Sequence, residues 1–206
     1  MGGKCSKTSQ GDLKREEVLA EYDKMCDGYD KMTAAKQVTV DTLKSWLDDP
    51  NSKVVLLDTR TPAEYEHAVI SQDAKLLEPS GPGMALTMAS GRALTFNTAV
   101  PSASSIDPEA KVVVYCTAGL RSGFACTSLD RSWNTETQRR ELYSLHGGTR
   151  MAQDIETARI AGIIAWVNSG YPVCDPKTGE ERQEVHAYAH KWGKFVWERP
   201  GMRAKY

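Results

Sequence analysis

The amino-acid sequence predicts an α/β domain, in which a central and mostly parallel sheet carries helices on both faces. Short apolar runs alternate with stretches of helical periodicity, the pattern of a sheet whose strands are joined by helices. Apolar residues fill Val54–Leu57 and most of Lys111–Tyr115 without interruption, as expected of central strands covered on both faces. A chain of 206 residues is long enough for one such domain with appendages but short for two.

The composition excludes several classes of function. The net charge of −1 gives no strongly basic surface, so we expect no nucleic-acid partner. No apolar run is long enough to cross a bilayer and the N-terminus has no signal peptide, which predicts a cytoplasmic chain. The five cysteines, an odd number without a C-x-x-C pair, predict neither a disulfide framework nor a zinc site and fit a reducing compartment. We expect neither a metal nor a cofactor.

Residues 1–37 are expected to form a flexible leader followed by an amphipathic helix. The first ten residues are small and polar and cannot form a core. Between Asp12 and Met32, apolar residues recur at helical spacing among many charges, at Val18, Tyr22, Met25, Cys26 and Tyr29. The polar face of this helix mixes acids with bases, which favours packing against the domain over binding to a membrane surface.

Two strand–helix units open the domain. Val38–Val40 is a brief β-branched strand, and Asp41 is the predicted cap of a helix whose apolar residues lie within residues 43–47. Val54–Leu57 is the next strand. Thr61–Glu64 then reads Thr-Pro-Ala-Glu, a capping box with proline at the first helical position, so a second helix is predicted to start there.

The middle of the chain departs from this rhythm at residues 78–108, which we interpret as an insertion. Glu78 to Ser105 is rich in Ser, Gly, Ala, Thr and Pro, and Arg92 is its only charge after Glu78. Long segments without a core pattern are usually either disordered or lids that cover a substrate. We favour disorder over a lid.

Strands and helices alternate again from Lys111 onward. The strand Lys111–Tyr115 is followed by a helix through Phe124–Leu129 and by a strand at Leu142–Leu145. A second insertion, residues 149–161, overlaps the start of a last helix over Ile160–Val167. Ser, Gly and Pro residues directly after it stop this helix.

The domain is thus predicted to span residues 38–175, which leaves residues 176–206 as a C-terminal tail. Basic and aromatic side chains interleave near its end, at His190, Lys191, Trp192, Lys194, Phe195, Trp197 and Arg199. Such a stretch can contact anionic lipid or a partner protein. We favour the alternative, a helix packed on its own domain.

The clearest chemistry lies at Cys116 to Ser122, a tight loop between a buried strand and the start of a helix. In a parallel sheet, ligands bind beyond the carboxyl ends of the strands, where Cys116 lies. A helix that begins near Arg121 directs free N–H groups and its positive dipole end toward the loop. Gly119 can adopt left-handed backbone angles, so that consecutive amides point inward. The loop therefore predicts an anion site with a nucleophilic Cys116 and an adjacent cation, Arg121.

A simpler interpretation is that Cys116 is a buried thiol at a strand end and that Arg121 forms a surface salt bridge. We favour the reactive site because strand, cysteine, glycine, arginine and helix start follow one another in the required order. Cys126 and Cys174 have no such setting and are expected to be structural.

Four motifs resemble the rhodanese superfamily over most of Val38 to Val173. They are Val38–Leu43, the run Leu57–Arg60 with Glu64-Tyr65, the Cys116 loop, and Gly147-Gly148 with Ala165-Trp166 and Gly170–Val173. The chain departs from the family where members usually have Gly-His-Ile-x-Gly-Ala, because it reads Ala68–Asp73 there instead. The two insertions are further departures, and neither interrupts the Cys116 loop.

The resemblance implies a rhodanese-like sulfurtransferase. Cys116 to Arg121 is C-x4-R, the short loop of sulfurtransferases, whereas related phosphatases and arsenate reductases carry C-x5-R. By this resemblance, Cys116 takes sulfur from a small anionic donor such as thiosulfate, or from a persulfide. It then passes the sulfur from a Cys116 persulfide to a thiol or cyanide. The substrate-binding residues are then Thr117, Ala118, Gly119, Leu120, Arg121 and Ser122, and the supporting ones are Asp58, Arg60 and Glu64. The alternatives are a membrane-tethered binding or signalling module without turnover and, less favoured, a phosphatase or arsenate reductase.

The first six residues match the M-G-x-x-x-[ST] pattern for myristoylation of Gly2. One myristoyl chain binds a membrane only weakly, so a palmitoyl group on Cys5 or lysines such as Lys4 are needed for a stable anchor. In a eukaryotic cell we therefore expect the protein on the cytosolic face of a membrane, at the inner leaflet. The alternative is a chance match in a flexible leader. The sequence predicts no particular protein partner.

Overall fold

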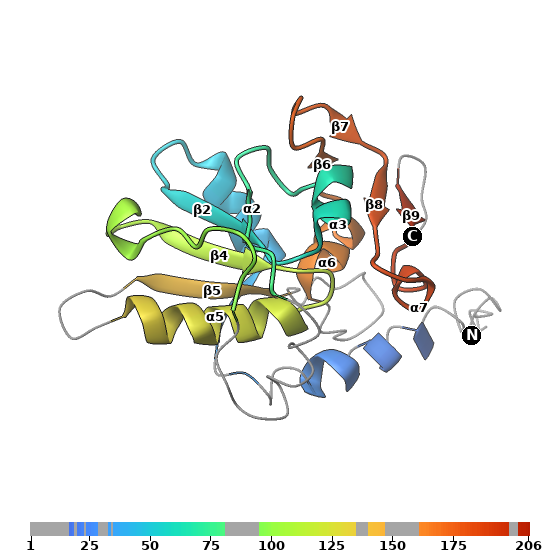
Figure 1. The fold of residues 1–206 in the computed structure, drawn as a ribbon. Helices are drawn as coiled ribbons and strands as arrows, with labels where there is room; N and C mark the ends of the chain where they lie inside the picture. The colour runs from blue at the N-terminus through green and yellow to red at the C-terminus, as the bar shows by residue number, and fades with distance from the viewer. Residues whose placement is uncertain are drawn as a thin grey trace, which may run out of the picture.

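A five-stranded sheet lies at the centre of the molecule (Figure 1). The computed structural model describes residues 17–18, 20–22, 24–28, 33, 35–80, 95–134, 140–146, 161–197 and 202–206. The strand order is β1-β5-β4-β2-β3 and every neighbouring pair is parallel. The strands are β1 (Lys36–Thr39), β2 (Val54–Asp58), β3 (Lys75–Leu76), β4 (Lys111–Tyr115) and β5 (Glu141–His146). The predicted fold class, an α/β domain with a mostly parallel sheet, is confirmed.

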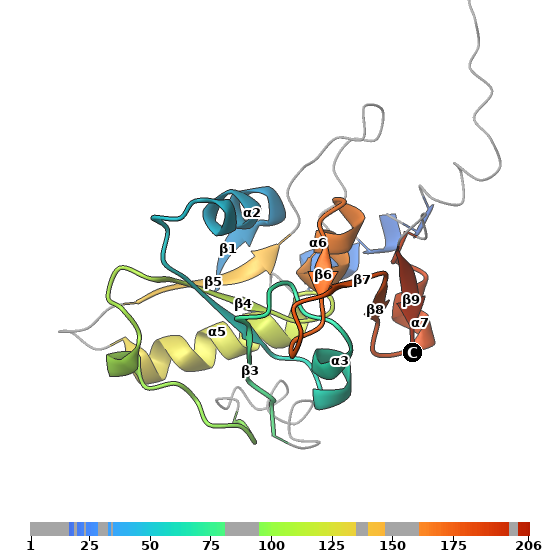
Figure 2. The same ribbon diagram turned by 90° about the horizontal axis from the view of Figure 1, so that it is seen from above.

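Helices cover both faces of the sheet, as predicted. The helix α5 (Leu120–Trp133) lies on one face, and α2 (Val40–Asp48) and α6 (Gly162–Asn168) lie on the other (Figures 1 and 2). Because successive side chains of a strand point to opposite faces, β4 contributes to two cores. Val113 and Tyr115 join the core with α6, whereas Val112 and Val114 join the core with α5. This double burial explains why the strand is continuously apolar.

The two opening strand–helix units lie where the sequence predicts them, with one correction. The capping box is confirmed, because the Thr61 hydroxyl accepts from the Glu64 N–H and the Glu64 carboxylate accepts from the Thr61 N–H at the start of α3 (Pro62–His67). The prediction that Asp41 caps α2 is wrong. Thr39 is the cap, since its hydroxyl accepts the Thr42 N–H at 3.1 Å.

The described residues between positions 17 and 28 are helical and pack on the domain, as predicted. Tyr22 and Cys26 are buried in the same core as α6. The Tyr22 ring stacks on Phe195 with centroids 4.5 Å apart. The leader with Gly2 and Cys5 lies outside the described residues. Within the described part of the chain, no helix is both long enough and apolar enough to cross a bilayer.

The first predicted insertion is described at 78–80 and 95–108 but not at 81–94, and the second is described only at its last residue, Ala161. The interpretation of Glu78 to Ser105 as a disordered segment or a lid therefore lies outside the described residues only for 81–94, and Gly147-Gly148 lies outside them as well. On the described flanks of the first insertion, Pro79 pairs with Phe96 in an antiparallel bridge. A short 3-10 helix, η1 (Ala103–Ser105), leads back to the sheet.

The C-terminal tail packs on the domain, but its prediction as a helix is wrong for most of its length. Its elements are β7 (Glu181–Arg182), which pairs with β6 (Val173–Cys174), then β8 (Glu184–His186), α7 (His190–Gly193) and β9 (Arg203–Lys205). Strands β8 and β9 pair in parallel. Val185 is fully buried between more exposed neighbours, which is the two-residue period of a strand, and within the tail only α7 is helical among the described residues.

Candidate active site

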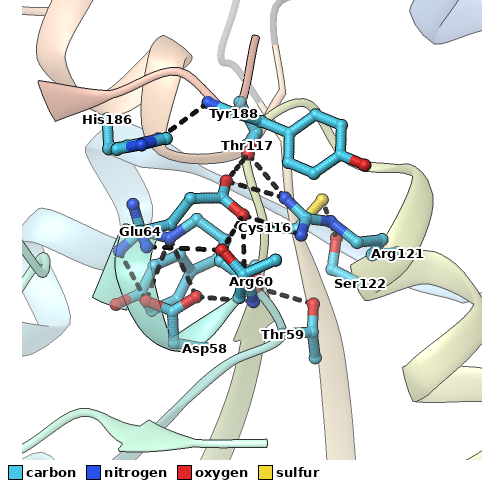
Figure 3. Close-up of polar contacts among 12 residues, drawn as sticks. Asp58, Thr59, Arg60, Glu64, Cys116, Thr117, Arg121, Ser122, His186 and Tyr188 are labelled. Carbon is cyan, nitrogen blue, oxygen red and sulfur yellow. Dashed lines mark hydrogen bonds and ion pairs between the residues drawn. The ribbon is translucent and has the colours of Figure 1, made fainter. Parts of the chain in front are cut away.

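Cys116 directly follows β4 and lies at the carboxyl end of the third strand in the sheet order (Figure 3). It is 2% exposed and lines a pocket of about 220 Å³. The Gly119 N–H donates to its sulfur at 3.1 Å, and the Ser122 hydroxyl, which also donates to the Gly119 carbonyl at 3.0 Å, lies 3.7 Å from the sulfur. The thiol is therefore buried but borders a cavity, and the Gly119 N–H points at its sulfur.

The backbone of the loop has the predicted form. Gly119 caps α5 in a left-handed conformation, with φ of 94°, and the helix starts at Leu120. A fourteen-residue helix therefore begins beside the sulfur, and its first turn contains Arg121 and Ser122. The positive end of a helix dipole and its free N–H groups stabilise an anion at this position. A thiolate on Cys116 is such an anion.

The start of helix α6 holds the Cys116 loop in place through hydrogen bonds to the loop carbonyls, a role that was not predicted from the sequence. The Ile163 N–H donates to the carbonyl of Cys116 at 2.8 Å, and the Ile164 N–H donates to that of Thr117 at 3.3 Å. Gly162 has φ of 69°, and a Cβ there would lie 2.4 Å from the Cys116 carbonyl oxygen. The close approach of α6 to the loop therefore requires glycine.

The N-terminal helix supports the same region. The Tyr22 hydroxyl donates to the carbonyl of Ala161 at 2.9 Å, and the Cys26 thiol contacts the carbonyl of Ala118 at 3.9 Å. Ala161 in turn lies against the loop, because a Cβ built on Gly119 would be 2.8 Å from the Ala161 Cβ. The helix therefore contacts the Cys116 loop itself and the residue that precedes α6.

Arg121 is neither a free cation nor part of a surface salt bridge, so both expectations for it are corrected. Its guanidinium binds the Glu64 carboxylate through two hydrogen bonds of 2.9 Å each. The Thr117 hydroxyl lies between them: it accepts from Arg121 at 2.7 Å and donates to Glu64 at 2.5 Å (Figure 3). Glu64 is held in the capping box of α3 and is completely buried, and its negative charge pairs with Arg121.

The Glu64–Arg121 pair is fully ionised at neutral pH. Burial by itself raises the pKa of Glu64, but the hydrogen bonds and charge of Arg121, the charge of Arg60 and the Thr117 hydroxyl outweigh it and lower this pKa to about 2. Burial likewise opposes the charge on Arg121, while Glu64 raises the pKa of the guanidinium above its ordinary value. The two charges therefore neutralise each other beside the cysteine loop.

Asp58 and Arg60 form a second buried ion pair. The Arg60 side chain donates to both Asp58 oxygens at 2.6–3.0 Å and to the carbonyl of Ala68 at 2.6 Å. Burial by itself lowers the pKa of Arg60, but the charge and hydrogen bonds of Asp58 outweigh burial and raise this pKa above its ordinary value. The arginine therefore stays charged. The pair joins the end of β2 to the turn after α3, so these residues act on the loop next to Cys116 and not on the cysteine itself.

Residues 39–151 match the sequence model of the rhodanese-like domain, which is more than half of the chain. The chain belongs to the rhodanese-like domain family. Among curated proteins no matching sequence was found.

Solved structures with a similar fold were found for this rhodanese-like chain. The BH2092 protein from Bacillus halodurans is 12% identical, with 79% of this chain and 87% of that chain covered and a TM-score of 0.43. A thiosulfate sulfurtransferase from Pseudomonas aeruginosa is 16% identical, with 87% of this chain and 27% of that chain covered and a TM-score of 0.46. RPA3614 from Rhodopseudomonas palustris is described as a protein of unknown function and possible tyrosine phosphatase. It is 16% identical, with 84% of this chain and 98% of that chain covered and a TM-score of 0.40.

The pocket of this rhodanese-like domain is wider than the loop that the sequence analysis singled out. Its described lining is Arg60, Thr61, Glu78, Pro79, Cys116, Thr117, Ala118, Leu120, Arg121, Tyr188 and Trp192. Four of the six predicted binding residues are among them, while Gly119 and Ser122 contact the sulfur instead. Tyr188 and Trp192 were missed as site residues. Aromatic residues interleave with basic ones in this tail, but nothing in their order along the chain places them at the cysteine.

The other two cysteines of the domain, Cys126 and Cys174, do not lie at the start of a helix and are not among the described lining residues of the pocket, as predicted. Cys126 is buried in the core with α5, and burial raises the pKa of its thiol far above the ordinary value. Cys174 is half-buried in β6, and burial raises its pKa as well. Among the described residues, no group of three or more His, Cys, Asp or Glu side chains is arranged to hold a metal ion.

Proposed function

We propose that this chain is a sulfurtransferase that carries a sulfane sulfur on Cys116. The single observation that supports this most is the setting of the thiol, which borders a pocket and accepts the Gly119 N–H at the start of α5. A terminal persulfide sulfur on Cys116 carries negative charge, which the helix start stabilises. Family membership favours the same chemistry.

The transfer has two nucleophilic steps. In the first, the Cys116 thiolate attacks the outer sulfur of the donor, a new S–S bond forms, and the donor's own bond to that sulfur breaks. The leaving group, sulfite from thiosulfate or a thiolate from a persulfide, departs with the electron pair. In the second step a thiol or cyanide acceptor attacks the outer sulfur, and the Cys116 thiolate is restored. No net oxidation occurs and no cofactor takes part.

The pairing of Arg121 favours this function over phosphatase or arsenate reductase activity. A phosphoryl group is usually held by a bidentate arginine. Both terminal nitrogens of Arg121 already bind the fully buried Glu64 carboxylate, so binding an oxyanion there requires the buried pair to break. The alternative of a binding module without turnover gives no reason for the donors that contact the Cys116 sulfur.

Intact-mass measurement tests the proposal directly. Wild-type protein incubated with thiosulfate, an organic thiosulfonate or a persulfide is expected to gain the mass of one sulfur atom, and a reducing thiol should remove it again. Absence of any gain with every one of these donors contradicts the proposed function. A chromogenic phosphate ester in the same buffer tests the phosphatase alternative, and we expect no hydrolysis.

We propose in addition that Gly2 is myristoylated and Cys5 palmitoylated, which brings the domain to the cytosolic face of a membrane. The M-G-x-x-x-[ST] pattern supports this proposal. Metabolic labelling in eukaryotic cells should place a myristoyl chain on the wild type but not on Gly2→Ala, and Cys5→Ser should lose only the palmitoyl label. Unlabelled wild-type protein contradicts the anchor and leaves the proposed chemistry untouched.

A Gly162→Ala variant is expected to impair both stability and the reactivity of Cys116. Alanine in a left-handed conformation costs about 1–2 kcal/mol, and its Cβ also meets the backbone carbonyls of Cys116 and Thr117 at 2.4 and 2.6 Å. Relief of this contact must move the cysteine loop away from α6. We expect a lower melting temperature and slower gain of sulfur.

Gly179→Ala is the matched control for this prediction. Gly179 also has a positive φ, 74°, but a Cβ there meets the flexible end of the Gln72 side chain instead of backbone. Gly179→Ala should lower the free energy of unfolding only by the cost of the left-handed backbone at alanine. The rate at which Cys116 gains sulfur should stay as in the wild type. Equal rates for Gly162→Ala and wild type would show that α6 does not position the loop.

A further inference from the structure

The positive charges of the pocket are already compensated. Both arginines that line it are paired within the fold, Arg60 with Asp58 and Arg121 with Glu64. The Nη1 atom of Arg60 has no hydrogen-bond partner but is completely buried. Among the described lining residues, Glu78 then adds a further carboxylate. Together with a Cys116 thiolate, the described groups carry net negative charge, which repels a small dianion.

One wall of the pocket is aromatic. Tyr188 and Trp192 line it from the C-terminal tail, and Pro79, Ala118 and Leu120 add apolar surface. The Tyr188 ring lies against the Arg121 guanidinium, with its centroid 5.2 Å from the central carbon (Figure 3).

The aromatic wall is held in place. Tyr188 is the only described non-glycine residue with a positive φ, 64°, and its N–H donates to the imidazole of His186 at 3.0 Å. Trp192 contacts Phe195 with ring centroids 6.2 Å apart, and Phe195 stacks on Tyr22 of the N-terminal helix. Strained backbone that persists at a binding site is typical of a functional constraint. Tyr188 and Trp192 both lie beyond the family match at residues 39–151.

We propose that the sulfur donor of this site is a persulfide or related sulfane compound with an apolar or aromatic body, not thiosulfate, and that Tyr188 and Trp192 select it. This inference rests on the proposed sulfur transfer. A cavity of about 10–15 Å³ holds one water, so the pocket of about 220 Å³ has room for such a body beside Cys116. The body packs on the two rings, while its sulfur reaches the Cys116 thiolate.

The reaction with such a donor, R–S–SH, balances without a further reactant. The Cys116 thiolate forms a bond to the outer sulfur, the bond between the two donor sulfurs breaks, and R–S⁻ leaves with the electron pair. The proton of the donor remains on the transferred sulfur or passes to water. The apolar body R returns to solvent with the leaving thiolate, which vacates the aromatic wall for an acceptor.

Three synthetic donors separate charge from apolar body. Thiosulfate is a small dianion, methanethiosulfonate is a monoanion of similar size, and benzenethiosulfonate is a monoanion with an aromatic ring. We expect kcat/KM for Cys116 persulfide formation to rise in this order. Aromatic contacts and burial of the ring predict a gain on the order of tenfold from the methyl to the phenyl donor.

The variants Tyr188→Ala, Trp192→Ala and Trp192→Phe test the wall itself. We expect the phenyl-to-methyl ratio of kcat/KM to fall to within about threefold in the two alanine variants and to lie in between for Trp192→Phe. Tyr188 is 53% exposed, so its loss should not unfold the protein. Tyr143→Ala is the control, because Tyr143 is a half-buried tyrosine on β5 outside the described pocket lining, and it should keep the wild-type ratio.

Each outcome decides one of the two claims. A ratio that stays unchanged in the Tyr188 and Trp192 variants, or a kcat/KM for thiosulfate as high as for benzenethiosulfonate, overturns the inference about the donor and leaves sulfur transfer intact. Failure of all three donors and of a persulfide R–S–SH to load Cys116 overturns the proposed function, and with it this inference. A ratio that falls in the Tyr188 and Trp192 variants but not in Tyr143→Ala supports both.

Discussion

A Cys116→Ser variant is expected to gain no sulfur from any donor and to lose sulfur transfer. A serine hydroxyl is a far weaker nucleophile than a thiolate at neutral pH. Its neighbours, the Gly119 N–H and the Ser122 hydroxyl, also have no base among them that could activate it. We expect the rate of transfer to fall by at least about 10³-fold. Intact mass after incubation with each donor, and transfer to an acceptor thiol, measure the loss.

The matched control is the same substitution at Cys174. That cysteine is half-buried in β6, where the Gln72 backbone also hydrogen-bonds its thiol, but it does not precede the start of a helix and is not among the described lining residues of the pocket. Cys174→Ser should load one sulfur at the wild-type rate. Sulfur gain by Cys116→Ser, or its loss in Cys174→Ser, assigns the chemistry to a different thiol. Because serine is close in size to cysteine, both variants should melt near the wild-type temperature.

The parts of the fold that follow from local sequence were predicted well. Continuous apolar runs mark β2 and β4 because both faces of each strand are covered. The start of α3 follows from Thr61 and Glu64, since a capping box involves only residues three positions apart. The cap of α2 was misplaced because Thr39 and Asp41 are both competent caps, and only the backbone geometry decides between them.

In the candidate site, too, the features set by neighbouring residues were predicted and those set by distant residues were not. Cys116 and Gly119 lie within one loop, and their order along the chain was enough to predict the thiol and the left-handed turn. The partner of Arg121 was not predictable, because Glu64 is 57 residues away in sequence and its own local role is to cap α3. Nothing local indicates that one carboxylate serves two purposes.

The walls of the pocket were the least predictable part. Tyr188 reaches the pocket through the pairing of β8 with β9 and through a left-handed backbone at a residue other than glycine. Neither feature leaves a local signature in the sequence. The same holds for Gly162, whose need for glycine arises from the Cys116 carbonyl more than forty residues earlier in the chain.

Glu64→Gln is expected to be among the most destabilising single changes in this domain. The substitution keeps the shape but removes the charge that compensates Arg121, and it turns an amide N–H₂ group toward donors of Arg121 or Thr61. Breaking a buried ion pair by removing one partner costs about 3–5 kcal/mol. For a chain of this size, that corresponds to a fall in Tm on the order of 10 °C.

Glu66→Gln is the matched control, the same substitution two residues further along α3 on an exposed side chain, and it should change stability by less than about 0.5 kcal/mol. The pH dependence gives an independent check. The pKa of Glu64 is about 2 against an ordinary value of 4.5, so its contribution to stability is present above pH 4.5 and is lost as the pH falls toward 2. The difference in unfolding free energy between wild type and Glu64→Gln should therefore narrow in acid.

The double variant Glu64→Gln/Arg121→Met separates loss of the pair from burial of an unpaired charge. If the guanidinium left without its carboxylate causes most of the damage, its removal should restore part of the stability lost in Glu64→Gln. Additive losses would instead mean that the arginine finds another anion or reaches water. In the single variant, a released Arg121 also adds an uncompensated cation to the pocket, so Glu64→Gln should react relatively better with thiosulfate than the wild type does.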